Sequence, residues 1–470
     1  MKKIILTITF IFSISLQSQW KEIYATYDDE TNGTGDNTVD VSVIKENKFV
    51  ALCTQKDNTC YLIPYVNADS ALGRKQFYGY SPATDGFFQK WASGFDEVQL
   101  LNAWHAVIGP DTLLYVANND SLHNILVFGF DSDTIISVDF RLETGNNSLS
   151  GISVDKNGLV YVLNDTSIGK NDDLKIYPPK SQWSPTRIMN PIKTINLPDG
   201  IYKSLAVSND GKQIFVTDYL KRKILKYIIT PQSNYVLDEN FNFVVSPLDT
   251  NRVTAGLDTA YVTGLAHLKT NNLLYVALNK YFGGSSWYKF AKIYTLNPNS
   301  GAVIDTIDQA QWNFNLTGGY NKRGNGTTPG NASGYASPYD LDFDENKNLY
   351  TISYYGWTVE KWNYTGTLPT IISSVKQISN SLPKYFTLEQ NYPNPFNPTT
   401  IIRFSILKDA EIKLTIKNIL GQVISTPVNE KLNSGTHEVK IDFNNLPSGN
   451  YYYTISDGVN SITKKMMFLQ

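Results

Sequence analysis

The sequence has few of the residues from which several common site types are built. It contains two cysteines among 470 residues, which excludes a disulfide-dense scaffold and a zinc site made of four thiolates. Its four histidines never show the His-x-x-x-His spacing of a helical zinc site. A Gly-x-Ser-x-Gly nucleophile motif and a Gly-x-x-x-x-Gly-Lys-Ser/Thr phosphate loop are also missing from the sequence. Two frequent classes of enzyme are therefore not indicated.

An excess of charge of one sign is lacking as well. The 41 Lys and Arg residues nearly balance the 43 Asp and Glu residues, which gives a formal net charge of −2, and no long basic run occurs. Proteins that bind nucleic acid by neutralising phosphates carry a basic patch, so we expect no nucleic-acid partner. The hydrophobic share of 41% is that of a folded chain, and the aromatic share of 13% favours strands.

Long apolar runs are absent except at the N-terminus. Lys2 and Lys3 precede an apolar run over residues 4–16, which polar residues follow. This is the pattern of a signal peptide, predicted over residues 1–18 with cleavage near Ser18. The run is shorter than the roughly 20 residues of a membrane-spanning helix, so we expect no transmembrane span. A buried N-terminal strand or helix is the alternative interpretation.

The middle of the chain, residues 20–378, contains one pattern six times. A short apolar strand is followed by a polar turn, and then by a second strand that ends in an aromatic and a β-branched residue. A third strand rich in Ile, Leu and Tyr comes next. The copies cover residues 39–50, 104–116, 151–162, 204–216, 264–276 and 339–350. Units of about four strands at intervals of roughly 46–76 residues are typical of a β-propeller.

The fold class predicted from these repeats is all-β, with a six-bladed β-propeller. A seventh blade remains possible between Cys60 and Trp104, where the spacing is loose. Propellers usually close by pairing strands from the two ends of the repeat region, and residues 22–27 are the candidate closing strand. A Ser- and Asn-rich stretch before Pro383 then indicates a linker, placed at residues 379–384.

Alternating strands and turn residues over residues 385–470 predict a small antiparallel β-sandwich. The segment contains Asn-Tyr-Pro-Asn-Pro-Phe-Asn-Pro at 391–398, Leu-Gly-Gln at 420–422, Ser-Gly-Asn-Tyr at 448–451 and Lys-Lys-Met-Met-Phe at 464–468. In these motifs it resembles the type A C-terminal sorting domain of the type IX secretion system. The matching motif residues are Pro393, Asn394, Pro395, Gly421, Gly449, Tyr451, Lys464 and Lys465.

This resemblance implies a route and a partner. The type IX secretion machinery would recognise the domain, and the chain would pass through the periplasm and cross the outer membrane. Its location would then be extracellular or on the outer-membrane surface, either anchored or released. The resemblance says nothing about the activity of the propeller.

The repeats themselves resemble the NHL and gluconolactonase-like six-bladed propellers, through Gly-Ile-Ser-Val-Asp at 151–155 and its echoes. Such propellers include lactonases, a peptide-amidating lyase and binding modules, so the fold does not decide the function. The resemblance implies a metal site of one Glu, two Asn and one Asp on the inner strands. Three of the aligned positions here are Gly151, Ser204 and Gly264, so that ligand set is not reproduced.

The inner ends of the blades still give one candidate site. Aligning the copies puts at one level of the channel Asp40, Trp104 or His105, Gly151, Ser204, Gly264 and Asp340. Because the first and last blades are neighbours in a closed ring, Asp40 and Asp340 should approach each other. With His105 they could hold a hard cation such as Ca²⁺, share a proton or act in catalysis. Alternatively, these groups satisfy strand ends or ordered water.

Two aromatic loops are candidate ligand-binding segments. Residues 311–337 are rich in Gly, Asn and Thr and include Trp312, Tyr320 and Tyr335, while residues 281–287 end in Trp287. Long loops in compact domains are often functional, and exposed aromatics could stack on sugar rings. The alternative is that these side chains anchor surface insertions to the blades.

The two cysteines flank a six-residue turn. Because the periplasm is oxidising, a disulfide between Cys53 and Cys60 is predicted, with two buried thiols as the alternative.

The sequence thus predicts a secreted or cell-surface binding module for a glycan, peptide or protein. The alternative function is a metal-dependent, lactonase-like hydrolase or lyase with its site at the channel mouth.

Overall fold

The fold is that of a computed structural model of the chain. It describes residues 19–27, 37–54, 60–66, 78–79, 100–119, 124–131, 134–142, 144, 148–165, 172–183, 189–219, 221–230, 232–245, 260–279, 287–320, 322, 336–354, 358–366, 368, 376–379, 386–443 and 446–469. The predicted signal peptide therefore lies outside the described residues. Among the helices of the described part, none is both long and apolar enough to cross a membrane.

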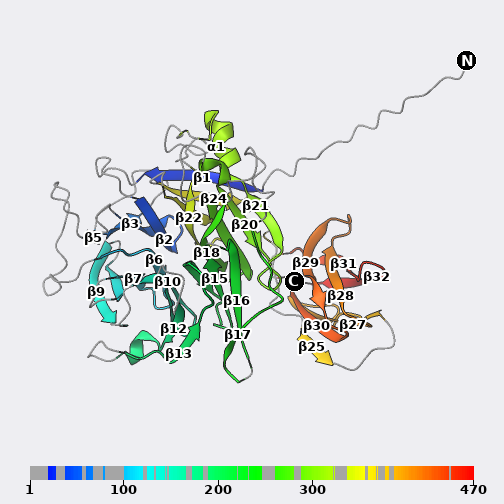
Figure 1. The fold of residues 1–470 in the computed structure, drawn as a ribbon. Coiled ribbons are helices and arrows are strands. Elements are labelled where there is room, and N and C mark those ends of the chain that lie inside the picture. The colour runs from blue at the N-terminus through cyan, green and yellow to red at the C-terminus, as the bar shows by residue number, and fades with distance from the viewer. Residues whose placement is uncertain are drawn as a thin grey trace, which may run out of the picture.

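Six four-stranded antiparallel sheets form the blades of the propeller in the described part of the chain (Figure 1). The first three blades are β2 (Asn37–Lys45), β3 (Lys48–Thr54), β4 (Cys60–Val66) and β5 (Tyr78–Gly79); β6 (His105–Ile108), β7 (Leu114–Ala117), β8 (Ile125–Asp131) and β9 (Thr134–Leu142); and β10 (Leu149–Val154), β11 (Val160–Asn164), β12 (Asp173–Tyr177) and β13 (Lys193–Asn196).

The remaining blades complete the ring. They are β14 (Tyr202–Val207), β15 (Gln213–Asp218), β16 (Lys223–Ile229) and β17 (Tyr235–Leu237); β18 (Tyr261–Leu268), β19 (Leu273–Asn279), β20 (Lys292–Leu296) and β21 (Val303–Ile307); and β22 (Pro338–Phe343), β23 (Leu349–Ser353), β24 (Thr358–Tyr364) and β1 (Trp20–Tyr27). Two short 3-10 helices, η2 (Lys180–Gln182) and η4 (Trp287–Phe290), lie in the connections.

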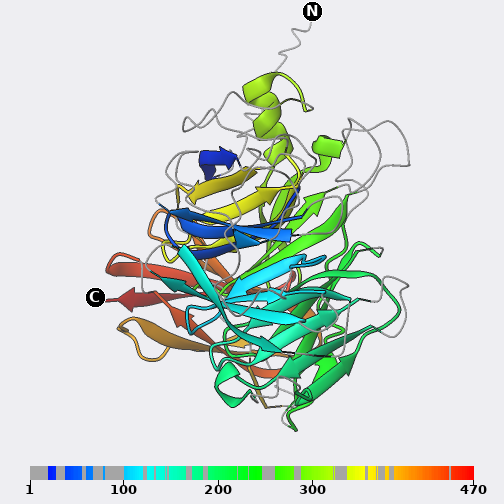
Figure 2. The ribbon, with the colours of Figure 1, turned by 90° about the vertical axis from the view of Figure 1, so that its left-hand side faces the viewer.

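The ring closes with six blades. The first strands of successive blades contact one another in the order β2, β6, β10, β14, β18, β22 and back to β2. Because β2 and β6 are in direct contact, no further blade fits between them, although most residues between Cys60 and Trp104 lie outside the described part. The predicted closing strand is confirmed: β1 pairs with β24, from Trp20 opposite Tyr364 to Tyr27 opposite Thr358. Figure 2 shows blue β1 beside the yellow strands of this blade.

The repeated aromatic residue of the sequence pattern explains how the blades hold together. Each second strand carries one such residue, and all six are buried: Phe49, Tyr115, Tyr161, Phe215, Tyr275 and Tyr350. The second strands β3, β7, β11, β19 and β23 are buried along their whole length. A blade has two apolar faces, and stacking in a ring removes both from water.

The C-terminal domain is a sandwich of two four-stranded antiparallel sheets. One sheet contains β25 (Lys376–Ser379), β30 (Gly435–Asp442), β27 (Thr399–Ile406) and β26 (Thr387–Leu388); the other contains β29 (Val423–Leu432), β28 (Ala410–Lys417), β31 (Gly449–Ser456) and β32 (Ser461–Phe468). Since β25 pairs with β30, the predicted propeller boundary at residue 378 falls inside a strand of the sandwich. Residues 380–384 of the predicted linker lie outside the described part.

The predicted disulfide between Cys53 and Cys60 is not formed, and both cysteines are buried thiols. The strand register gives the reason. Thr54 lies opposite Cys60, and Cys53 lies opposite Tyr61. Neighbouring residues of a strand point to opposite faces of the sheet, so the two sulfur atoms lie on different faces of the blade. The Cys60 thiol instead accepts a hydrogen bond from the backbone N–H of Ala103, at 3.3 Å.

A helix, α1 (Gln309–Thr317), begins the segment that the sequence indicated as a loop. Asp308 caps its N-terminus by accepting a hydrogen bond from the backbone N–H of Gln311, at 2.9 Å. Gly318 ends it in the left-handed conformation, with φ of 73°. Figures 1 and 2 both show α1 projecting outward beyond β1, the outer strand of the last blade.

Candidate functional site

The inner strands surround a channel with a cavity of about 300 Å³. Its wall consists mostly of apolar residues of β2, β6, β10, β14, β18 and β22. The polar side chains that line it include His105, His267, Lys269, Asp340 and Asp342. A cavity of this volume suits an ion, water or a small molecule rather than an extended polymer.

The channel brings together the three residues predicted as a site. Asp40 comes from β2, His105 from the start of β6 and Asp340 from β22, which are the inner strands of the first, second and last blades. His105 Nδ1 lies 3.6 Å from Asp40 Oδ2, and its Nε2 lies 3.7 Å from Asp340 Oδ1. One potential ligand atom from each residue lies within 4.8 Å of the others, and all three residues are buried.

Asp40, Asp340 and the aligned Ser204 also join neighbouring blades by hydrogen bonds. The backbone N–H groups on the inner edge of each blade lack a strand partner, so they need acceptors. Asp40 accepts from Ala106 N–H at 2.9 Å, Asp340 accepts from Val41 N–H at 3.2 Å, and Ser204 Oγ accepts from Leu265 N–H at 3.1 Å. In each case the acceptor belongs to one blade and the donor to the next blade around the ring.

The other aligned positions serve close packing. A Cβ atom on Gly264 would lie 2.4 Å from the carbonyl oxygen of Tyr339, which is in the next blade. A Cβ on Gly151 would lie 3.3 Å from side-chain atoms of Leu163 and Leu205. Glycine at these two positions allows neighbouring inner strands to approach each other.

Burial shifts the pKa values of the three site residues toward their neutral forms. Burial raises the pKa of Asp40 to about 7. Burial and the adjacent Asp40 carboxyl raise the pKa of Asp340 well above its ordinary value. Burial lowers the pKa of His105 to about 4. Two carboxyl groups therefore face a neutral imidazole in a site where charge is costly.

A second carboxylate level lies two residues further along β22. Asp342 accepts a hydrogen bond from Val43 N–H at 2.7 Å. Burial raises its pKa to about 6, and the charge of Lys269 acts in the opposite direction. Asp342 was not predicted from the sequence as a site residue. Its position two residues after Asp340 nevertheless indicates that both side chains lie on the same face of the strand.

The candidate aromatic residues are in different situations. Trp312 is engaged in packing: its indole N–H donates to Glu22 Oε2 at 2.7 Å, and its ring lies edge-on to Trp362. Tyr320 packs on Phe314 with ring centroids 4.6 Å apart. Trp287 begins η4, but its side chain is outside the described part of the structure, as is all of Tyr335.

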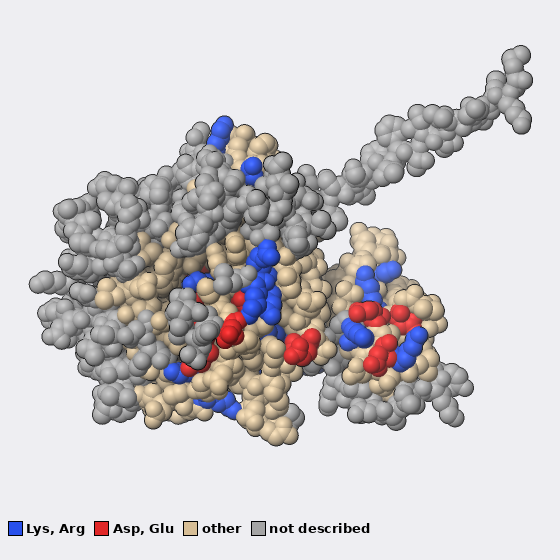
Figure 3. Space-filling model, in the orientation of Figure 1, with Lys and Arg blue, Asp and Glu red and all other residues tan. Residues whose placement is uncertain are grey.

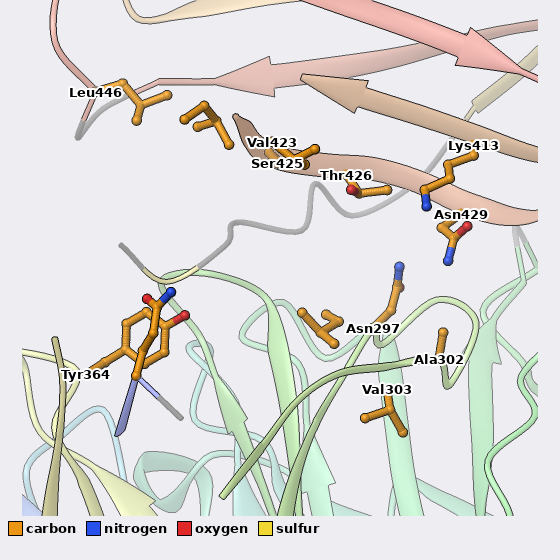
Figure 4. Close-up of a pocket in the computed structure, with 13 residues that line it drawn as sticks. Asn297, Ala302, Val303, Tyr364, Lys413, Val423, Ser425, Thr426, Asn429 and Leu446 are labelled. Carbon is orange, nitrogen blue, oxygen red and sulfur yellow. The ribbon is translucent and has the colours of Figure 1, made fainter. Parts of the chain in front are cut away.

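A separate groove of about 570 Å³ lies between the propeller and the sandwich (Figure 4). Asn297, Val303 and Tyr364 line it from the propeller, while Lys413 and Val423 line it from the sandwich. None of the residues predicted as catalytic, metal-binding or ligand-binding contributes to it.

The motif residues of the sandwich build one end of that domain. Asn394 Oδ1 accepts from Met467 N–H at 2.9 Å, and the buried Tyr451 donates its hydroxyl hydrogen to Pro447 O at 2.8 Å. Gly421 occupies a turn position with φ of 78°. The exposed residues Pro393 and Pro395 lie beside Asn394, Gly449 begins β31, and Lys464 and Lys465 lie on β32. Figure 3 shows blue and red side chains interspersed over the described surface of this domain.

Comparison with known families identifies the C-terminal domain. Residues 390–468 match the family described as the secretion system C-terminal sorting domain. The C-terminal domain is therefore a sorting domain of the type IX secretion system, as its motifs predicted. The chain is a type IX cargo that carries a β-propeller, and it is secreted or displayed at the cell surface.

Solved structures similar to the chain include several propellers. The Cps50 (Swd1) propeller domain of Myceliophteria thermophila has 11% identity and a TM-score of 0.39, covering 70% of this chain and 84% of that one. PorZ of Porphyromonas gingivalis, a surface component of the type IX system, has 16% identity and a TM-score of 0.37, covering 92% and 52%. A gluconolactonase from Xanthomonas campestris has 8% identity and a TM-score of 0.40, covering 73% and 88%.

No curated protein matches the chain.

Proposed function

We propose that the propeller is an extracellular binding module and that its ligand, a glycan, peptide or protein, contacts helix α1. The observation that carries this proposal is a helix that is held by polar contacts on its inner side and presents the exposed Phe314 on its outer side, with Tyr320 packed beside it. The chain's route to the cell surface would bring the outer side of α1 into contact with extracellular material.

The inner side of α1 is fixed by polar contacts to the closing blade. The Gln309 amide donates to Glu360 Oε2 and to Thr351 Oγ1, each at 3.0 Å. Trp312 adds the hydrogen bond to Glu22. Gln309 and Glu22 are buried. These contacts limit the motion of the helix, and a preorganised surface loses less entropy when it binds a ligand.

The outer side of α1 has the composition of a contact surface. Phe314 is 38% exposed and packs on Tyr320. Beside this pair, the Gln311 amide donates to Asn315 Oδ1 at 2.8 Å, and both residues have amide groups near the solvent. Rigid aromatic rings bordered by hydrogen-bonding groups are typical of binding hot spots.

The test uses the full chain, screened against glycans and cell-envelope proteins. We expect Phe314→Ala to weaken binding of any identified ligand by at least about tenfold, which corresponds to about 1.4 kcal/mol. Ile192→Ala is the matched control, because Ile192 is an exposed hydrophobic residue on a different blade. Failure to find a ligand, or equal binding by Phe314→Ala and the control, would refute the proposal.

A second candidate function follows from the residues gathered in the channel. With a metal ion held by Asp40, His105 and Asp340, the propeller would act as a hydrolase or lyase on small substrates. Asp340→Asn should then abolish turnover of lactones or esters without unfolding the ring. Absence of turnover by the unaltered protein, or equal turnover by the variant, would exclude this candidate.

A further inference from the structure

We propose that Asp40, His105 and Asp340 form a structural binding site for one divalent transition-metal ion, which fastens the closing blade of the propeller to the first two blades. This inference concerns the channel and does not depend on binding at α1. It also differs from the hydrolase candidate, because it requires a bound ion but no turnover.

The site offers three donor groups from three different blades. Potential ligand atoms of Asp40, His105 and Asp340 lie within 4.8 Å of one another. Ligand atoms around one Zn²⁺ ion are separated by roughly 3–4 Å, as bond lengths of about 2.0–2.2 Å imply. A small inward movement of these side chains would therefore complete the site.

The imidazole supplies an independent indication that points to a ligand. The His105 side chain is 10% exposed, and its Nδ1 atom has no hydrogen-bond partner. The other ring nitrogen, Nε2, lies 3.4 Å from Ser204 Oγ, which itself accepts a hydrogen bond from Leu265. If Nε2 carries the proton, it donates to Ser204, and the lone pair of Nδ1 is directed toward Asp40 Oδ2, 3.6 Å away. Asp340 Oδ1 lies 3.7 Å from Nε2, so its carboxyl must turn toward the Nδ1 side to join the site. A metal-bound histidine normally has its second nitrogen fixed in this way.

Both carboxylates keep an available lone pair despite their structural contacts. Asp40 Oδ2 accepts from Ala106 and Oδ1 accepts from Ser42, whereas Asp340 uses Oδ2 for Val41. A carboxylate oxygen can accept two interactions, so the inter-blade hydrogen bonds and metal coordination are compatible. Among the described residues, no Lys or Arg forms an ion pair with Asp40 or Asp340 to balance their charge.

The donor set decides between the kinds of divalent ion. Two carboxylates and one imidazole form a mixed oxygen and nitrogen set, which suits Zn²⁺ or Mn²⁺. Ca²⁺ prefers six to eight oxygen ligands, whereas His105 would supply a nitrogen atom. We therefore expect Zn²⁺ or Mn²⁺ to bind more tightly than Ca²⁺ at this site.

The location of the site indicates its role. Asp340 belongs to the last blade, Asp40 to the first and His105 to the second, so an ion would connect three consecutive blades across the point where the ring closes. β1, in contrast, pairs with β24 at the outer edge of the last blade. A buried ion that binds the folded ring and not the unfolded chain stabilises the ring by mass action.

The test measures metal content and thermal unfolding of the full chain. The protein is stripped with chelator, dialysed and titrated separately with Zn²⁺, Mn²⁺ and Ca²⁺. We expect about one Zn²⁺ or Mn²⁺ per chain and a rise in the unfolding midpoint of at least about 3 °C. A larger effect of Ca²⁺, or no binding of any of the three ions, would overturn the proposal.

Two variants separate coordination from general stability. Asp340→Asn keeps an acceptor for Val41 N–H but should lower metal affinity at least tenfold. Asp342→Asn is the matched control, because Asp342 also accepts a β2 backbone N–H in the channel but lies outside the cluster of three. It should bind metal like the unaltered chain. Equal metal binding by the two variants, with both folded by circular dichroism, would show that Asp340 is not a ligand.

Discussion

Asp340 in the last blade accepts a hydrogen bond from the backbone N–H of Val41 in the first blade, at 3.2 Å and across 299 positions of the sequence. Two more carboxylates continue the series: Asp342 accepts from Val43 N–H, and Glu345 accepts from Glu46 N–H at 2.9 Å. Acidic side chains in β22 and just after it thus accept hydrogen bonds from N–H groups in β2 and just after it. The ring is joined by carboxylates on the inside and by the β1–β24 pairing on the outside.

Replacing Asp340 by Ala should destabilise the propeller. The substitution leaves the buried N–H of Val41 without an acceptor, which costs about 1–3 kcal/mol. Urea unfolding in the presence of chelator measures this loss apart from any metal. Glu345→Ala is the control, because its hydrogen bond is exposed, and its effect should stay within about 0.5 kcal/mol. Equal stability of Asp340→Ala and the unaltered chain would contradict the role of the hydrogen bond.

The Glu22 carboxyl should make stability fall with rising pH. Burial and the neighbouring Glu360 raise the pKa of Glu22 from 4.5 to about 9. The folded state therefore keeps a proton that the unfolded chain has already lost, so its stability decreases as the pH rises through this interval. Glu22→Gln removes the titrating group, and its free energy of unfolding should fall less steeply between about pH 5 and pH 9. Parallel pH profiles for the two proteins would show that Glu22 does not carry this effect.

Gly264→Ala should be among the most disruptive small substitutions in the propeller. The added Cβ would meet the backbone of Tyr339 and Asp340, which cannot rotate away. Overpacking of this kind costs about 1–3 kcal/mol or more. At Gly449 nothing lies within 4 Å of an added Cβ, so Gly449→Ala serves as the control. If both variants unfold at the same urea concentration as the unaltered chain, the close approach of β18 and β22 is not as described.

Removing the sorting domain should stop secretion. The truncated chain should end before Lys376, because β25 forms part of the sandwich. We expect a chain without residues 376–470 to accumulate in the periplasm, as measured by cell fractionation. Residues 376–470 attached to a foreign exported protein should, conversely, direct it to the surface. Normal surface levels of the truncated chain would contradict the predicted route.

The global arrangement could be predicted because it follows from repetition. Six copies of one pattern imply six equivalent blades, and ring closure alone makes Asp40 and Asp340 neighbours. The burial of the repeated aromatic residue could also be predicted, because this residue recurs at the same position of each copy. The sequence left open whether Trp104 or His105 would face the two carboxyl groups. The structure shows that it is His105, the first residue of β6.

Local features that depend on strand register or on a few polar contacts could not be predicted from the sequence. A shift of one residue would place Cys53 opposite Cys60, and no pattern in the turn between them fixes that register. Helix α1 was missed because Gln309–Thr317 has no apolar stripe to mark it. Its stability comes from the Asp308 cap and from Gln309 and Trp312, whose partners lie in distant strands.

The pairing of β1 with β24 also sets the order of events during folding. Trp20 leaves the ribosome about 340 residues before its partner Tyr364 is made, so the last blade stays incomplete until nearly the whole propeller exists. Without this pairing β24 lacks its outer strand partner, and an unpaired strand edge is prone to pair with other chains. The propeller can become a ring only when both of its ends are free on the same side of the membrane.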